Sequence, residues 1–153
     1  MTETKKLAPT FVAQSTAGPI DLVSLRGKKV VLYFYPKDNT SGCTLEGQHF
    51  TALYDQFVKN DCVVIGVSRD SLKSHQNFCS KQGFPFALIS DPNEALCQAY
   101  DVMKLKKMYG REYMGVERST FLIDRDGYLA QEWRKVKVPG HVQAVLEAVI
   151  ALG

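Results

Sequence analysis

The sequence has the length and composition of an ordinary globular domain. Its 153 residues are 45% apolar and 23% charged, which excludes a disordered, collagen-like or coiled-coil chain. The net charge of +3 is too small to indicate a nucleic-acid partner by itself. The longest apolar runs, such as Val30–Tyr35 and Cys62–Val67, are far shorter than the ~20 residues of a membrane-spanning helix. We therefore expect a single domain over residues 1–153, without a membrane span.

The N-terminal segment and the cysteines indicate a reducing compartment. The first residues, MTETKKLAPTF, contain neither an apolar core nor a small-residue cleavage site, so we expect no secretory signal and a cytoplasmic location. Cys43, Cys62, Cys79 and Cys97 are separated by 19, 17 and 18 residues, which leaves no CxxC redox motif and no CxxC zinc knuckle. We expect free thiols unless one of them has a catalytic redox role.

Apolar runs alternate with amphipathic segments along the chain. In chain order, the expected elements are a hairpin of Phe11–Thr16 and Ile20–Val23, a buried strand at Lys29–Tyr35, a helix over Cys43–Lys59, a strand at Cys62–Ser68, a helix over Ser71–Gln82, a strand at Phe86–Ser90, a helix opened by Asp91, strands at Ser119–Ile123 and Tyr128–Trp133, and a helix over His141–Leu152.

Turn and capping residues set several of these boundaries. Gly18-Pro19 is expected to form the turn of the N-terminal hairpin. Ser71 is a candidate N-cap, and Gly83 a candidate C-terminal stop, for the helix between them. Asp91 is the expected N-cap of the next helix, with a proline at its first position. Gly127 suits the turn between the last two strands.

This order of elements predicts an α/β architecture. The last two strands are joined by a tight turn and must be antiparallel, so the central sheet is mixed and flanked by helices. The outline is that of a thioredoxin-like fold with an N-terminal β-hairpin extension and one inserted helix. The order of the strands in the sheet stays open.

The loop Pro36–Gly42 and the residue that follows it contain the candidate catalytic groups. It follows a buried strand and leads into a helix whose first turn contains Cys43, where free N–H groups and the helix dipole stabilise a thiolate. Thr40 can offer its hydroxyl to an oxygen substrate, Pro36 can wall a small pocket, and Gly42 permits close backbone approach. This set suits attack of a thiolate on a peroxide O–O bond, which produces a sulfenic acid.

Here the sequence resembles the peroxiredoxins. The pattern PxxxTxxC and the longer string YFYPKDNTSGCTLE are similar to the peroxiredoxin Q, or bacterioferritin comigratory protein, class; the similarity continues through KMYGREYMGVERSTFLIDRDG and WRKVKVPGH. The resemblance implies that Cys43 is the peroxidatic cysteine and that Thr40 and Pro36 shape its pocket. It also implies that Arg118 favours the thiolate and polarises the peroxide, with Glu46 able to orient that arginine.

The resolving cysteine departs from a common pattern of this class. Many members carry it five residues after the peroxidatic cysteine, where this chain has Gln48. Other members carry it about 36 residues later, and Cys79 lies 36 residues after Cys43. The resemblance therefore implies an intramolecular Cys43–Cys79 disulfide. A disulfide needs Cα atoms within ~7 Å, so we expect local unwinding near one or both cysteines on oxidation. The alternative is a one-cysteine mechanism in which an external thiol attacks the sulfenic acid.

By resemblance, the substrates are hydrogen peroxide and organic hydroperoxides, and the reductant is thioredoxin or a similar dithiol. No metal, haem or flavin is implied, and members of this class are often monomeric. A general disulfide oxidoreductase is disfavoured because the chain lacks CxxC. A non-catalytic binding or chaperone module and a Cys/His metal-binding protein remain as alternatives.

Several of these residues also have a purely structural interpretation. Cys62 and Cys97 are expected to be inert, packed thiols, and Cys79 itself could be core packing. Glu46 could be an exposed carboxylate in the first turn of its helix. The basic run 104–111 is expected to be a solvated loop.

Overall fold

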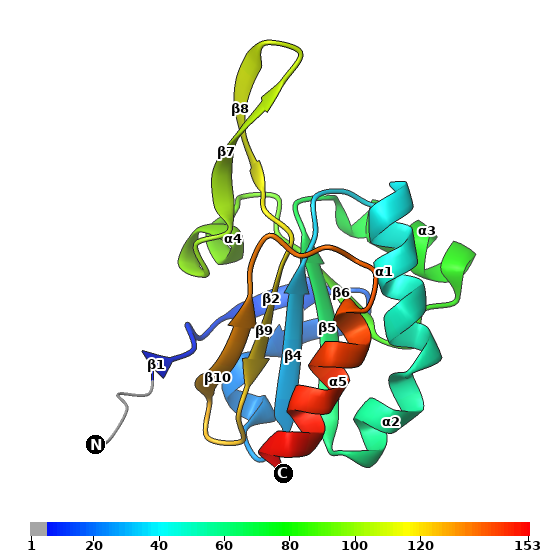
Figure 1. The fold of residues 1–153 in the computed structure, drawn as a ribbon, viewed down its shortest axis with the longest axis vertical. Coiled ribbons are helices and arrows are strands. Elements are labelled where there is room, and N and C mark those ends of the chain that lie inside the picture. Colours follow the sequence, from blue (N-terminus) through cyan, green and yellow to red (C-terminus); the bar gives the residue numbers. More distant parts are fainter. Residues whose placement is uncertain (1–5) are drawn as a thin grey trace.

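The computed structural model describes residues 6–153, which form an eight-stranded mixed sheet flanked by helices (Figure 1). The strands lie in the order β1-β10-β9-β4-β5-β6-β2-β3. Their bounds are β1 Lys6–Leu7, β2 Val12–Ser15, β3 Gly18–Asp21, β4 Lys29–Phe34, β5 Cys62–Ser68, β6 Ala87–Ser90, β9 Ser119–Ile123 and β10 Tyr128–Trp133. The helices are α1 Ser41–Ala52, α2 Tyr54–Lys59, α3 Leu72–Gln82, α4 Ala95–Ala99 and α5 His141–Leu152, with a 3-10 turn at Leu22–Leu25.

Strand directions confirm the mixed sheet. β4, β5 and β6 are parallel neighbours, whereas β9 runs antiparallel to β4 and β10 antiparallel to β9. All six residues of β4 are buried, as expected for a central strand covered on both faces. None of the helices in residues 6–153 has the length and apolarity required to cross a membrane.

The alternation of side chains along β4 divides the core into two layers. Val31 and Tyr33 pack on one face with Phe50 of α1 and Phe78 of α3, whereas Leu32 faces the opposite layer. Helices α1, α2, α3 and α5 contribute to the first layer, and α4 contributes to the second. The carboxyl end of β4 is followed by a short loop that leads to the start of α1 (Figure 1).

Three expected boundaries are wrong in detail. The turn of the N-terminal hairpin is Thr16-Ala17, because Gly18-Pro19 already pairs within β3. The expected helix over Cys43–Lys59 is interrupted at Leu53, which separates α1 from α2.

The third boundary is the start of the helix after β6. Helix α4 begins at Ala95, because Glu94 adopts a left-handed conformation with φ of 63°. Asp91 still caps it from four residues upstream, since its carboxylate accepts the N–H groups of Leu96 and Cys97 at 3.1 and 2.9 Å.

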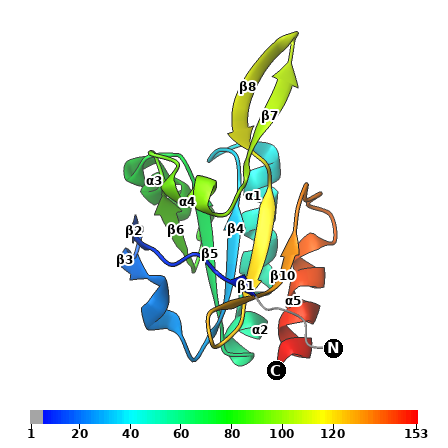
Figure 2. The same cartoon turned by 90° about the vertical axis from the view of Figure 1, so that its left-hand side faces the viewer.

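The basic run expected to be a loop is instead a two-stranded hairpin. β7 (Met103–Met108) and β8 (Arg111–Val116) pair in register and project beyond the end of the sheet near α1 (Figure 2). The two-residue turn is Tyr109-Gly110, and both residues have positive φ, 52° and 74°. Most side chains of this hairpin are exposed, so it lacks the apolar alternation from which a strand is predicted.

Candidate active site

Cys43 lies where the sequence places it, in the first turn of α1. Thr40 is the N-cap of this helix, and the Cys43 side chain is buried, with 2% exposure of the residue. The first N–H groups of a helix have no partner within it, so they form a donor-rich, electropositive end beside the thiol.

Arg118 reaches this thiol from the junction between β8 and β9. Its Nη2 donates to Cys43 Sγ at 3.3 Å, and its Nη1 donates to Glu46 Oε1 at 2.7 Å. One planar guanidinium therefore spans the sulfur and a carboxylate one helical turn further along α1. The position of Gly42 explains the close approach, because a Cβ added there would lie 3.1 Å from Arg118 Nη2.

Glu46 is fully buried, so the expectation of an exposed carboxylate is wrong. Burial raises the pKa of Glu46 to about 7, although the nearby Arg118 opposes that rise. Its Oε2 has no hydrogen-bond partner among residues 6–153 and lies 4.0 Å from His141 Nε2. Burial, together with the charge of Arg118, lowers the pKa of His141 to about 4.

His141 is the neighbour that sequence reasoning missed. It begins α5, almost one hundred residues from Glu46 in sequence, and its Nε2 lies 2.8 Å from Thr120 Oγ1 of β9. No local pattern marks this residue, because its contact with Glu46 depends on how α5 packs against α1.

Thr40 and Pro36 border the loop that leads to Cys43. The hydroxyl of Thr40 donates to the carbonyl of Lys37 at 2.8 Å, so its oxygen is left to accept a hydrogen from a substrate. The role of this hydroxyl toward an oxygen substrate stays a prediction. Pro36 is half-buried at the start of the loop, and Asn39 takes a left-handed conformation with φ of 64°.

Comparisons with known proteins show the family to which the chain belongs. The model of the AhpC/TSA family matches residues 4–132. The chain is 58% identical to peroxiredoxin Bcp of Xanthomonas campestris over 125 residues, which cover 82% of this chain and 78% of the relative. The chain belongs to the peroxiredoxins of the AhpC/TSA family. It is a thiol peroxidase, which uses a peroxide substrate and a thiol reductant.

Solved structures place this peroxiredoxin in the peroxiredoxin Q, or bacterioferritin comigratory protein, class. A trapped intermediate or ligand complex of the X. campestris protein, described for its alkyl peroxide reduction, matches with 51% identity and a TM-score of 0.88, covering 92% of this chain and 90% of that one. Two Cys-to-Ser variants of X. campestris peroxiredoxin Q match with 51% and 52% identity and TM-scores of 0.90 and 0.88; they cover 94% and 92% of this chain, and 92% and 90% of their own chains. The thioredoxin-like fold is thereby confirmed.

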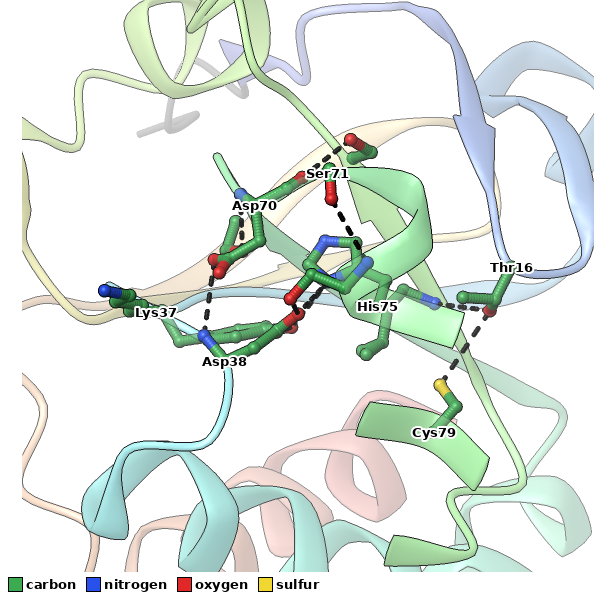
Figure 3. Close-up of polar contacts among 12 residues, drawn as sticks. Thr16, Lys37, Asp38, Asp70, Ser71, His75 and Cys79 are labelled. Carbon is green, nitrogen blue, oxygen red and sulfur yellow. Dashed lines mark hydrogen bonds and ion pairs between the residues drawn. The ribbon is translucent and has the colours of Figure 1, made fainter. Parts of the chain in front are cut away.

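Cys79 lies on α3 and is half-buried. Its Sγ lies 4.0 Å from Thr16 Oγ1 in the turn of the N-terminal hairpin (Figure 3). Burial raises the pKa of Cys79, and the contact with Thr16 only partly opposes this. All four cysteines are free thiols in this structure, so Cys43 and Cys79 are seen in their unlinked arrangement.

The other two cysteines of this peroxiredoxin are packed in the core. Burial raises the pKa of Cys62 to about 12 and raises that of Cys97 well above the ordinary range. No group of three or more His, Cys, Asp or Glu side chains within residues 6–153 could hold a metal ion.

Proposed function

We propose that Cys43 is the peroxidatic cysteine. Its thiolate attacks one oxygen of the peroxide, the O–O bond breaks, and a proton is taken up, so that Cys43 becomes a sulfenic acid and the other oxygen leaves as water or an alcohol. The observation that carries this proposal is the 3.3 Å contact between Arg118 Nη2 and Cys43 Sγ. A fixed cation beside the sulfur favours the thiolate and stabilises the charge on the leaving oxygen.

The remaining site residues would position the peroxide. Thr40 accepts the O–H of the substrate, and Pro36 forms one wall of the pocket. Glu46 holds the guanidinium of Arg118 in the orientation that faces the sulfur, which is supported by the 2.7 Å bond between Arg118 Nη1 and Glu46 Oε1.

We further propose that Cys79 resolves the sulfenic acid. Its sulfur bonds to Cys43 Sγ, the sulfenic oxygen leaves as water, and an intramolecular disulfide results. The two serine variants of the X. campestris protein are 36 residues apart along that chain, which is also the spacing of Cys43 and Cys79. Because the two thiols face different neighbours, disulfide formation would require local unwinding near one or both of them.

The proposed substrates are hydrogen peroxide and organic hydroperoxides. Support for the second class comes from the alkyl peroxide reduction described for the X. campestris relative. A dithiol such as thioredoxin would restore both cysteines by thiol–disulfide exchange. The protein would act in the cytoplasm as a monomer, with residues 1–153 as one domain.

Three serine variants test these assignments. Cys43→Ser should abolish peroxide consumption, because it removes the attacking sulfur. Cys79→Ser should still consume one equivalent of peroxide but lose turnover with thioredoxin, whereas the matched control Cys97→Ser should resemble the wild type. Wild-type turnover by Cys79→Ser would favour the one-cysteine mechanism, and peroxide consumption by Cys43→Ser would contradict the central assignment.

A further inference from the structure

A fully buried histidine–aspartate pair joins the loop before Cys43 to helix α3. Asp38 lies five residues before Cys43, and His75 lies four residues, about one helical turn, before Cys79. His75 Nδ1 is 2.7 Å from Asp38 Oδ2, and the two side chains are 0% and 1% exposed. Figure 3 shows the pair between the loop and the helix, with Cys79 further along the same helix.

Every polar atom of this pair is engaged. His75 Nε2 lies 2.8 Å from the carbonyl of Ile89 in β6, so both ring nitrogens lie within hydrogen-bond distance of an oxygen acceptor. Asp38 Oδ1 accepts the hydroxyl of Tyr35 at 2.6 Å, and Oδ2 also accepts the hydroxyl of Ser74 at 2.8 Å. Separating the pair would leave a buried charge without its partner, which is costly in a low-dielectric interior.

The same contact restrains both cysteine-bearing segments. If the loop and the first turn of α1 unwind, Asp38 moves; if α3 unwinds, His75 moves. Unwinding that extends to either of these residues breaks the bond between His75 and Asp38. Unwinding of this extent, if it brings the two sulfurs together, opens this one buried pair.

We propose that Asp38 and His75 are positioning residues that latch the reduced enzyme in its packed state and set the rate at which Cys79 reaches oxidised Cys43. This rests on the proposed function, in which Cys79 is the resolving cysteine. While the latch is closed, Cys43 lies beside Arg118 and reacts with peroxide. When it opens, the sulfur of Cys79 displaces the sulfenic oxygen of Cys43 as water and forms the disulfide.

A weaker latch should affect peroxide attack and disulfide formation differently. If the closed state predominates strongly, a weaker latch leaves the fraction of packed enzyme, and hence the rate of peroxide attack, nearly unchanged. Disulfide formation is proportional to the small open fraction, so it accelerates. Faster disulfide formation also lowers the share of Cys43 that a second peroxide converts to sulfinic acid.

The test follows both steps by rapid quenching. Reduced enzyme is mixed with hydrogen peroxide, alkylated at timed intervals and analysed by mass spectrometry for sulfenic, disulfide and sulfinic forms. His75→Gln should accelerate disulfide formation at least about tenfold, the factor that loss of one charge-assisted hydrogen bond implies, without accelerating peroxide attack. Ser74→Ala, which removes only one bond to Asp38 and is the variant to use if His75→Gln does not fold, should give a smaller change in the same direction.

Ser71→Ala is the matched control, since it removes the N-cap of α3 but leaves the histidine–aspartate pair intact. An equal acceleration by Ser71→Ala would overturn the proposal, because general fraying of α3 would then set the rate. Unchanged disulfide formation in both His75→Gln and Ser74→Ala would also overturn it while leaving the proposed function intact. Failure of every variant and the wild type to form a Cys43–Cys79 disulfide would instead contradict the proposed function itself.

A spectroscopic measurement reports the latch directly. In 15N NMR spectra, the ring-nitrogen signals of His75 should differ between the reduced enzyme, where Nδ1 lies against Asp38, and the disulfide form, where the ring has left Asp38. Identical His75 signals in the reduced and disulfide forms would show that the pair never opens, and would overturn the proposal.

Discussion

The fully buried carboxylate of Glu46 forms an ion pair with Arg118 beside the thiol of Cys43. Arg118 Nη1 lies 2.7 Å from Glu46 Oε1, while the other terminal nitrogen of the same guanidinium lies 3.3 Å from the sulfur. The carboxylate thereby holds a delocalised cation in one orientation, with a donor aimed at the reacting atom. A carboxylate with no exposed surface can do this only because Arg118 compensates part of the cost of its burial.

The first prediction concerns the shape of the guanidinium. Arg118→Lys keeps the charge but cannot bridge Glu46 and Cys43 with two fixed donors, so peroxide attack should slow by roughly 100-fold, as when one preorganised donor is lost. Stopped-flow mixing of the reduced enzyme with hydrogen peroxide measures this rate. Arg111→Lys, in the exposed hairpin, is the control and should leave the rate of peroxide attack unchanged. An unaltered rate in Arg118→Lys would show that the two fixed donors of the guanidinium are not required.

The second prediction uses two glycines of α1. A Cβ at position 42 would lie 3.1 Å from Arg118 Nη2, so Gly42→Ala should push the guanidinium off the sulfur and lower the peroxide rate about tenfold. The same change should not lower the free energy of unfolding, because alanine is the better helix former.

Gly47→Ala provides the opposite case in the same helix. A Cβ at that position would lie 2.3 Å from the ring of Phe84, so this substitution should lower the free energy of unfolding by about 1–3 kcal/mol. Urea titration and stopped-flow kinetics on both variants separate the two effects. If Gly42→Ala is as active as the wild type, the close approach of Arg118 is not required.

The third prediction concerns pH, because Glu46 and His141 act in opposite directions. The pKa of Glu46 is raised from 4.5 to about 7, so between these values the folded state holds the extra proton and stability falls as pH rises. The pKa of His141 is lowered from 6.5 to about 4, so in that window the unfolded state holds the extra proton and stability falls as pH decreases. The two contributions largely oppose each other in the wild type.

Glu46→Gln removes one side of this balance. Relative to the wild type, the variant should gain about 3 kcal/mol of unfolding free energy as pH rises from 4.5 to 7, and should lose stability more steeply in acid, where His141 acts alone. Urea titrations at several pH values measure the difference. For the control Glu147→Gln, at an exposed position of α5, the free energy of unfolding should depend on pH as it does in the wild type. The same pH dependence in Glu46→Gln would contradict the elevated pKa of Glu46.

Local sequence patterns predicted the elements that build the site, but not every contact within it. The buried run before Pro36 and the apolar spacing after Cys43 define β4 and the start of α1, because periodicity and capping act over a few residues. Arg118 was assigned by resemblance alone, since nothing in the local pattern distinguishes it from other arginines. The burial of Glu46 next to His141 depends on packing between α1 and α5, which the periodicity of apolar residues does not predict.

The hairpin β7–β8 shows a second limit of sequence reasoning. Seven of the twelve residues in its two strands are exposed, and the exposed ones include both charged and apolar side chains, so no clear strand or helix periodicity appears. The only local signal is Tyr109-Gly110, where glycine suits a left-handed position in a two-residue turn. The late start of α4 has a comparable cause, because the capping carboxylate of Asp91 reaches its N–H partners across an intervening turn.

The fourth prediction concerns the two packed cysteines. Because burial raises the pKa of Cys62 to about 12 and raises that of Cys97 further still, neither should form appreciable thiolate at neutral pH. In the folded, reduced enzyme, iodoacetamide should modify Cys43 first and leave Cys62 and Cys97 unmodified until the chain unfolds. Peptide-resolved mass spectrometry with and without urea checks this order, and rapid labelling of Cys97 in the folded state would contradict it.

The most direct test of the account is a peptide map of the oxidised enzyme. Fully reduced protein is treated with one equivalent of hydrogen peroxide, alkylated and digested without reductant. The account predicts one linked peptide that joins Cys43 to Cys79, with Cys62 and Cys97 alkylated. An unmodified Cys43 would contradict the account at its centre, and an oxidised Cys43 beside a free Cys79 would restrict it to a one-cysteine peroxidase.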